Sequence, residues 1–240
     1  MVDEQSQTVA DLPADVARNA YVVIAAYNEQ DCLAQVVERV RRVYPNVVVV
    51  DDGSTDETFT EARRCATFAL RHAVNRGQGA ALQTGIDFAL QRGAQFVVTF
   101  DGDGQHRVED IAALLSPICA GQCEICLGSR FLGQTVGMPA SRLLTLKLAV
   151  AFTRLVNGVK LTDAHNGLRA FSRKAATRIQ ITLDRMAHAS ELIDLIRETQ
   201  LPFKEVPVQI QYTERSLHKG QSFRGAFRIV VHYLLGRVLR

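Results

Sequence analysis

The amino-acid sequence predicts an α/β fold, in which a mostly parallel, Rossmann-like β-sheet carries helices on both faces. In the first half of the chain, apolar β-branched runs alternate with segments of helical periodicity. The run at residues 46–50 contains consecutive valines and does not alternate with polar residues, which indicates a strand buried on both sides. Strands and helices that alternate at this pitch form βαβ units with right-handed crossovers, and therefore a parallel sheet.

The expected elements follow in chain order. In the first half we expect strands within residues 20–27, 46–54, 68–73 and 94–101, and helices within 29–44, 56–66 and 77–93, the last closed by Gly93. In the second half we expect a fifth strand within 124–130 and a helix within 142–158 that ends at Gly158. A turn with a strand and a helix start is expected within 163–176, followed by a helix within 186–200. The last expected element is an edge strand within 203–213, which tolerates Pro207.

Three regions are expected along the chain. We predict a disordered tail at residues 1–19, a single globular domain at residues 20–222 and a basic amphipathic helix at residues 223–240.

Composition indicates a soluble globular protein. Hydrophobic residues make up 47% and charged residues 22% of the chain, and the net charge of +3 is too small to indicate nucleic-acid binding. There is no long uncharged apolar run and no secretory signal at the N-terminus, so we expect a cytoplasmic protein without a transmembrane helix.

Three of the cysteines have a spacing that elsewhere holds an iron–sulfur cluster. They are Cys119, Cys123 and Cys126, in the segment CAGQCEIC. Residues three apart in a strand point to opposite faces, and the segment that follows has the pattern of a strand. We therefore favour buried, reduced cysteines over a cluster.

Polar clusters follow three of the predicted strands. They are YNE after the first strand, DDGSTD after the second and DGDGQH after the fourth. Ligands of parallel sheets bind beyond the carboxyl ends of the strands, where these clusters would meet. Three clusters at one edge indicate a binding site, whereas one would indicate only a loop.

The segment DGDGQH carries the strongest chemical signal. Asp101 and Asp103 share one face of an extended chain, and two such close carboxylates repel each other unless a cation lies between them or one is protonated. A Mg²⁺ or Mn²⁺ ion bound to carboxylates and substrate phosphates fits this pattern. Gln105 and His106 are neutral candidates for completing the ligand shell. The alternative is a solvated turn of Asp and Gly.

The other two clusters have the composition of a nucleotide site. In DDGSTD, Ser54 or Thr55 is expected to cap the next helix, which leaves an aspartate for hydrogen bonds to a base or ribose. Tyr27 is a candidate for stacking, and Asn28 and Glu29 are candidates for hydrogen bonding.

Anion-binding groups are also present. Gly77 and Gly79 precede a helix next to Arg76, which fits a phosphate site, although the spacing matches no P-loop. Arg130 and Arg142 could face anionic ligands or be ordinary surface arginines.

Eight segments of this chain occur in the order found in family 2 glycosyltransferases. They are VVIAAYNEQ, VVVVDDGSTDET, NRGQGAALQTGI, VVTFDGDGQH, GSRF, DAHNGLRAFSRKA, MAHASELI and VPVQIQYT with KGQS. The resemblance covers residues 20–222 and is strongest to the polyprenyl-phosphate sugar synthase branch, which includes dolichol-phosphate mannose synthases. The family usually has a proline where this chain has Ala25, and we expect that change to loosen the strand end without abolishing binding.

The resemblance implies a fold, a reaction and site residues. It implies a GT-A fold and inverting transfer of a hexose, of the mannose or glucose type, from a nucleotide-diphosphate sugar to polyprenyl phosphate. It implies a divalent Mg²⁺ or Mn²⁺ held by Asp101, Asp103 and Gln105. The nucleotide-sugar residues that it implies are Ala26, Tyr27, Glu29, Asp52, Arg76, Asp101 and Gly102. Arg130 and Arg142 resemble the arginines that bind the acceptor phosphate, and the implied catalytic residues are Asp103, Arg130 and Glu191.

The C-terminal segment FRIVVHYLLGRVLR, within residues 223–240, leaves two interpretations open. Its apolar residues fall on one side, with arginines able to reach anionic lipid, so it could lie on the cytoplasmic face of a membrane. It could equally pack on the domain. Because a polyprenyl acceptor resides in a bilayer, we favour peripheral membrane contact or a membrane-protein partner.

Two alternatives to transfer onto a lipid phosphate stay open. A phosphate oxygen is already an anion, but a saccharide hydroxyl would need a general base, for which Glu191 and Asp163 are candidates. A non-catalytic nucleotide-sugar-binding partner of a membrane protein would be favoured if the metal carboxylates were missing, and both are present.

Overall fold

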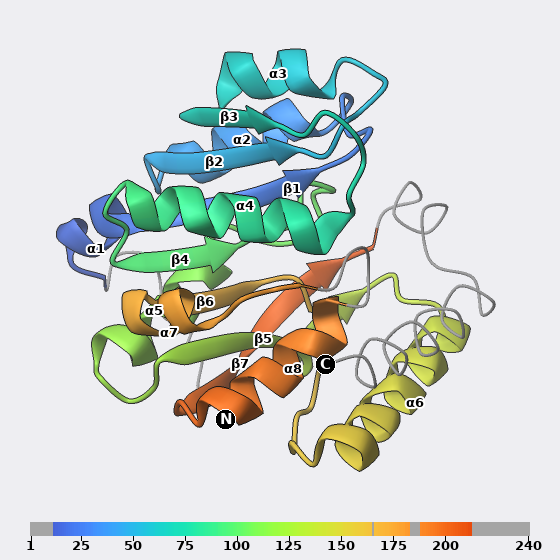
Figure 1. The fold of residues 1–240 in the computed structure, drawn as a ribbon. Helices are drawn as coiled ribbons and strands as arrows, with labels where there is room; N and C mark the ends of the chain where they lie inside the picture. Colours follow the sequence, from blue (N-terminus) through green and yellow to red (C-terminus); the bar gives the residue numbers. More distant parts are fainter. Residues whose placement is uncertain (1–11, 165, 183–187, 213–240) are drawn as a thin grey trace, which may run out of the picture.

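A computed structural model describes residues 12–164, 166–182 and 188–212 of the chain. Within them, seven strands form one mixed sheet in the order β3-β2-β1-β4-β6-β5-β7 (Figure 1). The strands are β1 (Ala20–Ala26), β2 (Asn46–Asp51), β3 (Phe68–Arg71), β4 (Phe96–Thr99), β5 (Ile125–Val136), β6 (Arg169–Ser172) and β7 (Phe203–Gln211).

The helices are α1 (Ala14–Asn19), α2 (Leu33–Arg41), α3 (Thr58–Cys65), α4 (Gln78–Gln91), α5 (Asp110–Cys119), α6 (Ala140–Asn157), α7 (Arg173–Arg178) and α8 (His188–Thr199). Gly93 and Gly158 both have positive φ just beyond α4 and α6, as expected for residues that end helices.

The sheet is mostly parallel, as predicted. β1 pairs in parallel with β2 and β4, β2 pairs in parallel with β3, and β5 pairs in parallel with β7. The exception is β6, which is antiparallel to both β4 and β5. Because β6 is antiparallel to its neighbours, its first residue, Arg169, pairs with Thr99 at the carboxyl end of β4 and with Leu127 of β5.

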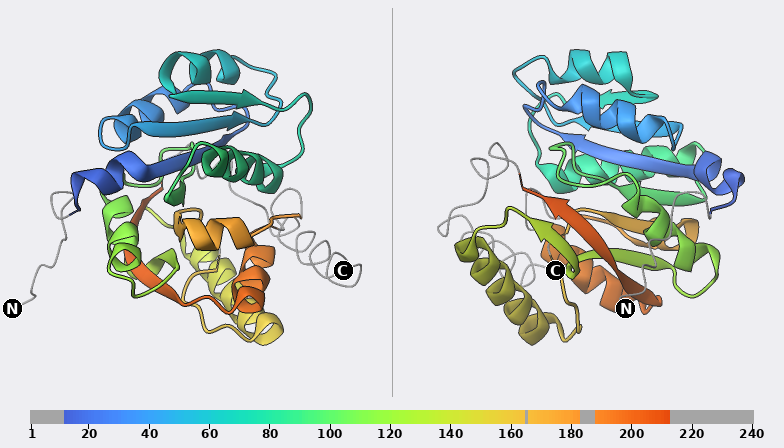
Figure 2. Two further views of the ribbon diagram at one scale, coloured as in Figure 1. Left: turned by 60° about the vertical axis from the view of Figure 1, so that its left-hand side comes forward. Right: turned by 180° about the vertical axis from the view of Figure 1, so that it is seen from behind.

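Helices cover both faces of the sheet, which confirms the predicted layers. Alternate residues of the buried strands enter two cores: Val22 and Ile24 of β1 pack with α2 and α5, whereas Val23 packs with α4. Figure 2 shows α1 and α2 on the face opposite α4. Pro207 lies within β7 at the edge of the sheet, as expected.

The start of the described chain differs from the prediction. Residues 14–19 were expected within a disordered tail, but they form α1, which follows Pro13. Asp15 in the first turn and Arg18 in the last turn complement the helix dipole, and Val16 is buried in the core. The tail prediction is therefore wrong for these residues. The helix predicted over residues 223–240 lies outside the described residues.

The cysteines are only partly as expected. Cys123 and Cys126 are buried, which confirms that prediction, but Cys119 at the end of α5 is exposed. Burial raises the pKa of the Cys123 and Cys126 thiols, so both favour the neutral form.

Candidate active site

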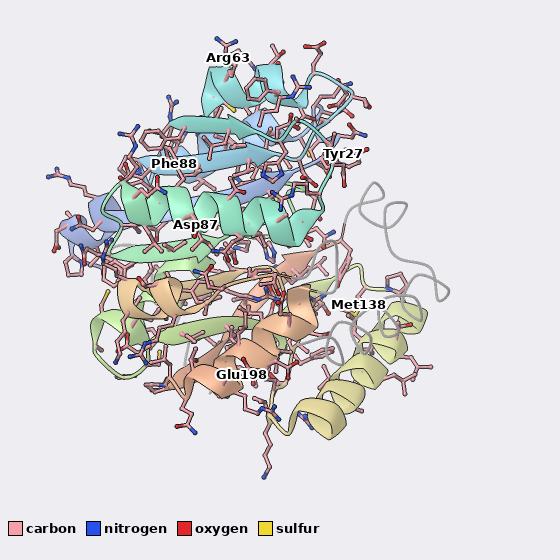
Figure 3. The ribbon with its side chains drawn as sticks, in the orientation of Figure 1. Tyr27, Arg63, Asp87, Phe88, Met138 and Glu198 are labelled. Atoms are coloured by element: carbon pink, nitrogen blue, oxygen red, sulfur yellow. The ribbon has the colours of Figure 1, made fainter. Side chains whose placement is uncertain are left out.

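The polar segments after β1, β2 and β4 meet at one edge of the sheet. These strands are parallel neighbours, so their carboxyl ends point the same way. Tyr27, directly after β1, is 44% exposed at this edge, where it can stack on a ligand. Figure 3 shows Tyr27 on the same side of the molecule as Met138, which precedes α6.

Hydrogen bonds from main-chain N–H groups to side-chain oxygens join the segments after β1 and β2. The Asn28 N–H donates to Ser54 Oγ (2.9 Å), and the Thr55 N–H donates to Asn28 Oδ1 (3.0 Å). The Glu29 N–H donates to Thr58 Oγ1 (2.8 Å). Asn28 has a φ of 54°, a left-handed conformation that Asn tolerates better than most residues.

The predicted helix cap is wrong. Ser54 accepts its hydrogen bond from Asn28, and α3 begins only at Thr58, after Glu57, with no side-chain cap on Glu57. Asp56 Oδ1 accepts from the Thr58 N–H (3.0 Å) instead. The Ser54 hydroxyl that was expected to cap the start of the helix therefore links the loops after β1 and β2.

Asp52 holds the segment that leads into α4. Its Oδ1 accepts from the Arg76 N–H (3.0 Å) and its Oδ2 from the Gly77 N–H (2.6 Å). His72 Nδ1 lies 2.8 Å from Asp52 Oδ1. The carboxylate is 2% exposed, so its first role in the structure is to shape this loop. Its predicted contact with the nucleotide stays a prediction.

Four other residues of the predicted nucleotide-sugar site lie along this edge. The Arg76 side chain is exposed. Ala26 and Gly102 are buried. The Ala26 carbonyl accepts from the Asp52 N–H (2.8 Å), and the Gly102 carbonyl accepts from the Cys32 thiol (3.2 Å). Glu29 is half-buried and its Oε2 accepts from the same thiol (3.3 Å). The structure brings these residues together, and their contacts with a nucleotide-sugar stay predictions.

Asp101 is fixed on several sides. Its Oδ2 lies 2.8 Å from His106 Nε2, and its Oδ1 accepts from Gln78 Nε2 (3.1 Å). A β-carbon placed on Gly167 would lie within 2.5 Å of the carboxylate carbon and closer still to both oxygens, so only glycine fits there. Sequence reasoning missed Gln78 and Gly167, because nothing local relates them to Asp101.

Asp103 is the second carboxylate. Its Oδ1 accepts from the Gln105 N–H (3.0 Å). Burial, together with the charge of Asp101, raises the pKa of Asp103 to about 6. A bound cation would relieve both effects, so the two residues fit a divalent ion.

The number of carboxylates also fits. Within the described residues, no three His, Cys, Asp or Glu side chains converge as a complete metal centre. Mg²⁺ commonly binds one or two carboxylates and takes its remaining ligands from substrate phosphates and water. Asp101 and Asp103 match that mode.

Arg130 already has a carboxylate partner. Its Nε donates to Asp163 Oδ2 (2.6 Å), its main-chain N–H donates to the same oxygen (3.1 Å), and its Nη1 donates to Tyr212 Oη (2.8 Å). Arg130 is 8% and Asp163 3% exposed. Its predicted contact with an acceptor phosphate stays a prediction, and Arg142, on α6, has a side chain outside the described part of the structure.

The candidate general bases are both engaged. Glu191 is 1% exposed on α8, and its Oε1 accepts from the Thr182 N–H (3.0 Å) and hydroxyl (2.5 Å). Asp163 accepts from Arg130. Both carboxylates are therefore already hydrogen-bonded inside the fold, and the predicted catalytic role of Glu191 stays a prediction.

Arg169 is a buried cation that the sequence did not single out. Burial lowers the pKa of Arg169 to about 10, and nearby Asp101 and Asp163 act in the opposite direction. With Asn166, it lines a small cavity against α8 that has room for about one water molecule. The cavity is too small for a sugar, so it is not the donor pocket.

Comparisons with known proteins agree with this geometry. Residues 21–179 match the model of the family described as glycosyl transferase family 2. The UDP-N-acetylglucosamine–dolichyl-phosphate N-acetylglucosaminyltransferase of Methanococcus voltae is 33% identical over 91% of this chain and 97% of its own length. The polyprenol monophosphomannose synthase of Mycolicibacterium smegmatis is 32% identical over 99% of this chain and 96% of its own length.

A solved structure shares the fold. Glucosyl-3-phosphoglycerate synthase from Mycobacterium tuberculosis superposes with a TM-score of 0.73 at 19% identity, covering 99% of this chain and 86% of that one. That protein has been crystallised with UDP and either Mn²⁺ or Mg²⁺. At this identity the likeness establishes the GT-A fold alone.

Proposed function

This chain belongs to glycosyl transferase family 2, in its polyprenyl-phosphate sugar synthase branch, and on that premise we propose that it moves a hexose from a nucleotide-diphosphate sugar to polyprenyl phosphate with the help of a divalent metal ion. The observation that carries the proposal is the pair Asp101 and Asp103, fixed at the carboxyl end of β4 beside the loops after β1 and β2.

Asp101, Asp103 and Gln105 would hold the metal ion. Bound there, Mg²⁺ or Mn²⁺ would act as a Lewis acid that neutralises the charge of the leaving diphosphate. The protein itself supplies a fixed geometry, since Asp101 and Asp103 are each oriented by hydrogen bonds before any ligand arrives.

The donor would lie along the loops after β1 and β2. Tyr27 would stack on the base, while Glu29, Asp52 and Arg76, with the main chain at Ala26 and Gly102, would contact the nucleotide. The joined loops support this assignment, because a pocket formed from fixed main chain loses little entropy when a ligand binds.

An anionic acceptor agrees with the state of the two candidate bases. Glu191 and Asp163 are buried and already accept hydrogen bonds, so neither is arranged to take a proton from a hydroxyl. A phosphate oxygen needs no base, and orientation and charge stabilisation suffice for its attack. This observation favours polyprenyl phosphate over a saccharide hydroxyl.

The acceptor would approach from a membrane surface. Leu144 and Leu148 lie one turn apart on α6 and are 61% and 57% exposed, with the exposed Lys147 between them. Figure 1 shows α6 at the periphery of the molecule. Among the described helices, none combines the length and hydropathy that crossing a bilayer requires. The face of α6 therefore supports peripheral contact with lipid.

A thermal-shift panel of UDP- and GDP-sugars, each with and without Mn²⁺, tests the donor site. We expect one nucleotide to raise the melting temperature in a metal-dependent way, because a ligand that binds only the native state stabilises it. No shift with any nucleotide would contradict the donor site.

The acceptor is tested separately. Incubation with the stabilising donor and either polyprenyl phosphate or a saccharide should give a glycolipid only with the phosphate. Transfer to the saccharide alone would overturn the acceptor assignment while leaving the donor site intact.

A further inference from the structure

We propose that His106 is a positioning residue for the metal site: its Nε2–H holds one oxygen of Asp101, so that the rest of the carboxylate is turned toward a divalent cation. The proposal rests on the metal-dependent function proposed above. It gives His106 a different role from the metal ligand that its place in DGDGQH suggested.

The geometry engages the ring nitrogen that a metal would otherwise use. His106 Nε2 lies 2.8 Å from Asp101 Oδ2. The imidazole is 5% exposed and packs edge-on against the ring of Phe100, with ring centroids 5.5 Å apart. A buried, packed ring cannot turn readily, so the direction of this hydrogen bond is set by the core.

The other ring nitrogen identifies the tautomer. His106 Nδ1 is buried and has no hydrogen-bond partner among the described residues. A proton on Nδ1 would be an unpaired buried donor, which is costly, whereas a proton on Nε2 is donated to Asp101. The geometry therefore places a proton on Nε2, donated to Asp101.

The backbone of this loop is anchored across the sheet. His106 forms an isolated bridge with Ile210 of β7, and the Gln211 N–H donates to the Gln105 carbonyl (3.0 Å). These contacts fix the position of the imidazole relative to the end of β4. Gln78 and Gly167 then restrict Asp101 from other directions, so the carboxylate has few orientations left.

Outer contacts of this kind commonly change metal affinity by about 10- to 100-fold when they are removed. We expect His106→Phe, which keeps a ring but loses the donor, to weaken Mn²⁺ binding at least 10-fold. His106→Gln, whose amide can place N–H near the position of Nε2, should restore most of the affinity. The measurement is Mn²⁺ titration followed by electron paramagnetic resonance, without nucleotide, then with UDP and with GDP.

His72 provides a matched control. Its Nδ1 lies at the same distance, 2.8 Å, from a carboxylate of the same edge, but that carboxylate belongs to Asp52. His72→Phe should leave Mn²⁺ affinity without nucleotide unchanged. If His106→Phe fails to fold, His106→Leu provides the loss of the donor, and circular dichroism identifies the variants that are folded.

The outcomes separate this role from the proposed function. If the wild-type protein binds no Mn²⁺ alone, with UDP or with GDP, the metal-dependent function and this role are both overturned. If the wild type binds Mn²⁺ and the folded His106→Phe protein binds it equally well, only the role of His106 is overturned. Equal weakening in His106→Gln and His106→Phe would also overturn it, because the donor would then not matter.

Discussion

Two regions of the candidate active site are stabilised by different kinds of interaction. Around β1, β2 and α4, side chains of Asn28, Ser54 and Asp52 bond to main-chain N–H groups of neighbouring loops. Around β5 and β6, charged side chains bond to one another, as Arg130 does to Asp163. In the first region, single side-chain acceptors fix the main chain. In the second region, two buried side chains of opposite charge compensate each other.

This difference follows from how the chain reaches the edge. In the first region parallel strands deliver loops next to one another, so that short polar side chains can reach the adjacent main chain. In the second region β6 is antiparallel to its neighbours, and buried Arg169 at its start interacts electrostatically with Arg130 and Asp163. We expect the largest effects from the proposed metal ligands Asp101 and Asp103, which lie between the two regions, followed by the buried ion pair.

Replacing Asp103 with Ala should reduce sugar transfer by about 10³-fold or more, because the charge of the leaving diphosphate loses its stabilisation. The fold should persist, since Asp103 makes only a local hydrogen bond to the Gln105 N–H. The measurements are transfer of labelled sugar and circular dichroism. Glu109→Ala is the control, because its carboxylate is 54% exposed in the same loop. Full activity of the Asp103 variant would exclude the metal role.

Removal of one partner of the buried ion pair should show that the second region depends on paired charges. Asp163→Ala leaves Arg130 buried without its carboxylate and should lower the free energy of unfolding by about 3–5 kcal/mol. The double variant Arg130→Met with Asp163→Leu should lose less, because no unpaired charge remains. Urea unfolding measures both. A double variant as unstable as the single one would contradict the ion-pair explanation.

In the first region, Asp52→Ala should lower the free energy of unfolding by about 2–3 kcal/mol, because the N–H groups of Arg76 and Gly77 lose their acceptor. No buried charge is left behind, so we expect a smaller loss than for Asp163→Ala. The same urea titration compares the two. Wild-type stability of the Asp52 variant would contradict the view that this carboxylate shapes the loop.

Surface leucines should affect lipid binding and not stability. Leu144→Ser with Leu148→Ser should change the free energy of unfolding by less than about 0.5 kcal/mol. Loss of about 1 kcal/mol of lipid contact from each side chain would weaken binding to anionic vesicles roughly 30-fold. Vesicle co-sedimentation measures it. Val74→Ser, at a position 66% exposed near the nucleotide loops, is the control and should bind as the wild type does.

The sequence predicted the first region better than the second. Valine runs and the polar residues that follow them are local signals, so β1, β2, β4 and the place of Asp101 and Asp103 could be read from the pattern. The partner of Arg130 lies 33 positions away, and no local pattern relates the two. Ser54 was misassigned because its partner, Asn28, belongs to another loop. α1 was missed because a helix of six residues with one buried side chain gives almost no periodicity.

The reversed strand β6 also has a consequence for the order in which the protein can assemble. The hydroxyl of Thr99 donates to the Gly167 carbonyl (2.7 Å), a contact that spans 68 positions of the chain. Gly167 in turn packs against Asp101. Contacts between such distant positions form late, since a long loop must close before they are gained. A newly synthesised first half would thus carry both proposed metal ligands, Asp101 and Asp103, but lack the Gly167 contact that restricts Asp101, and we expect the site to be completed only when β6 joins the sheet.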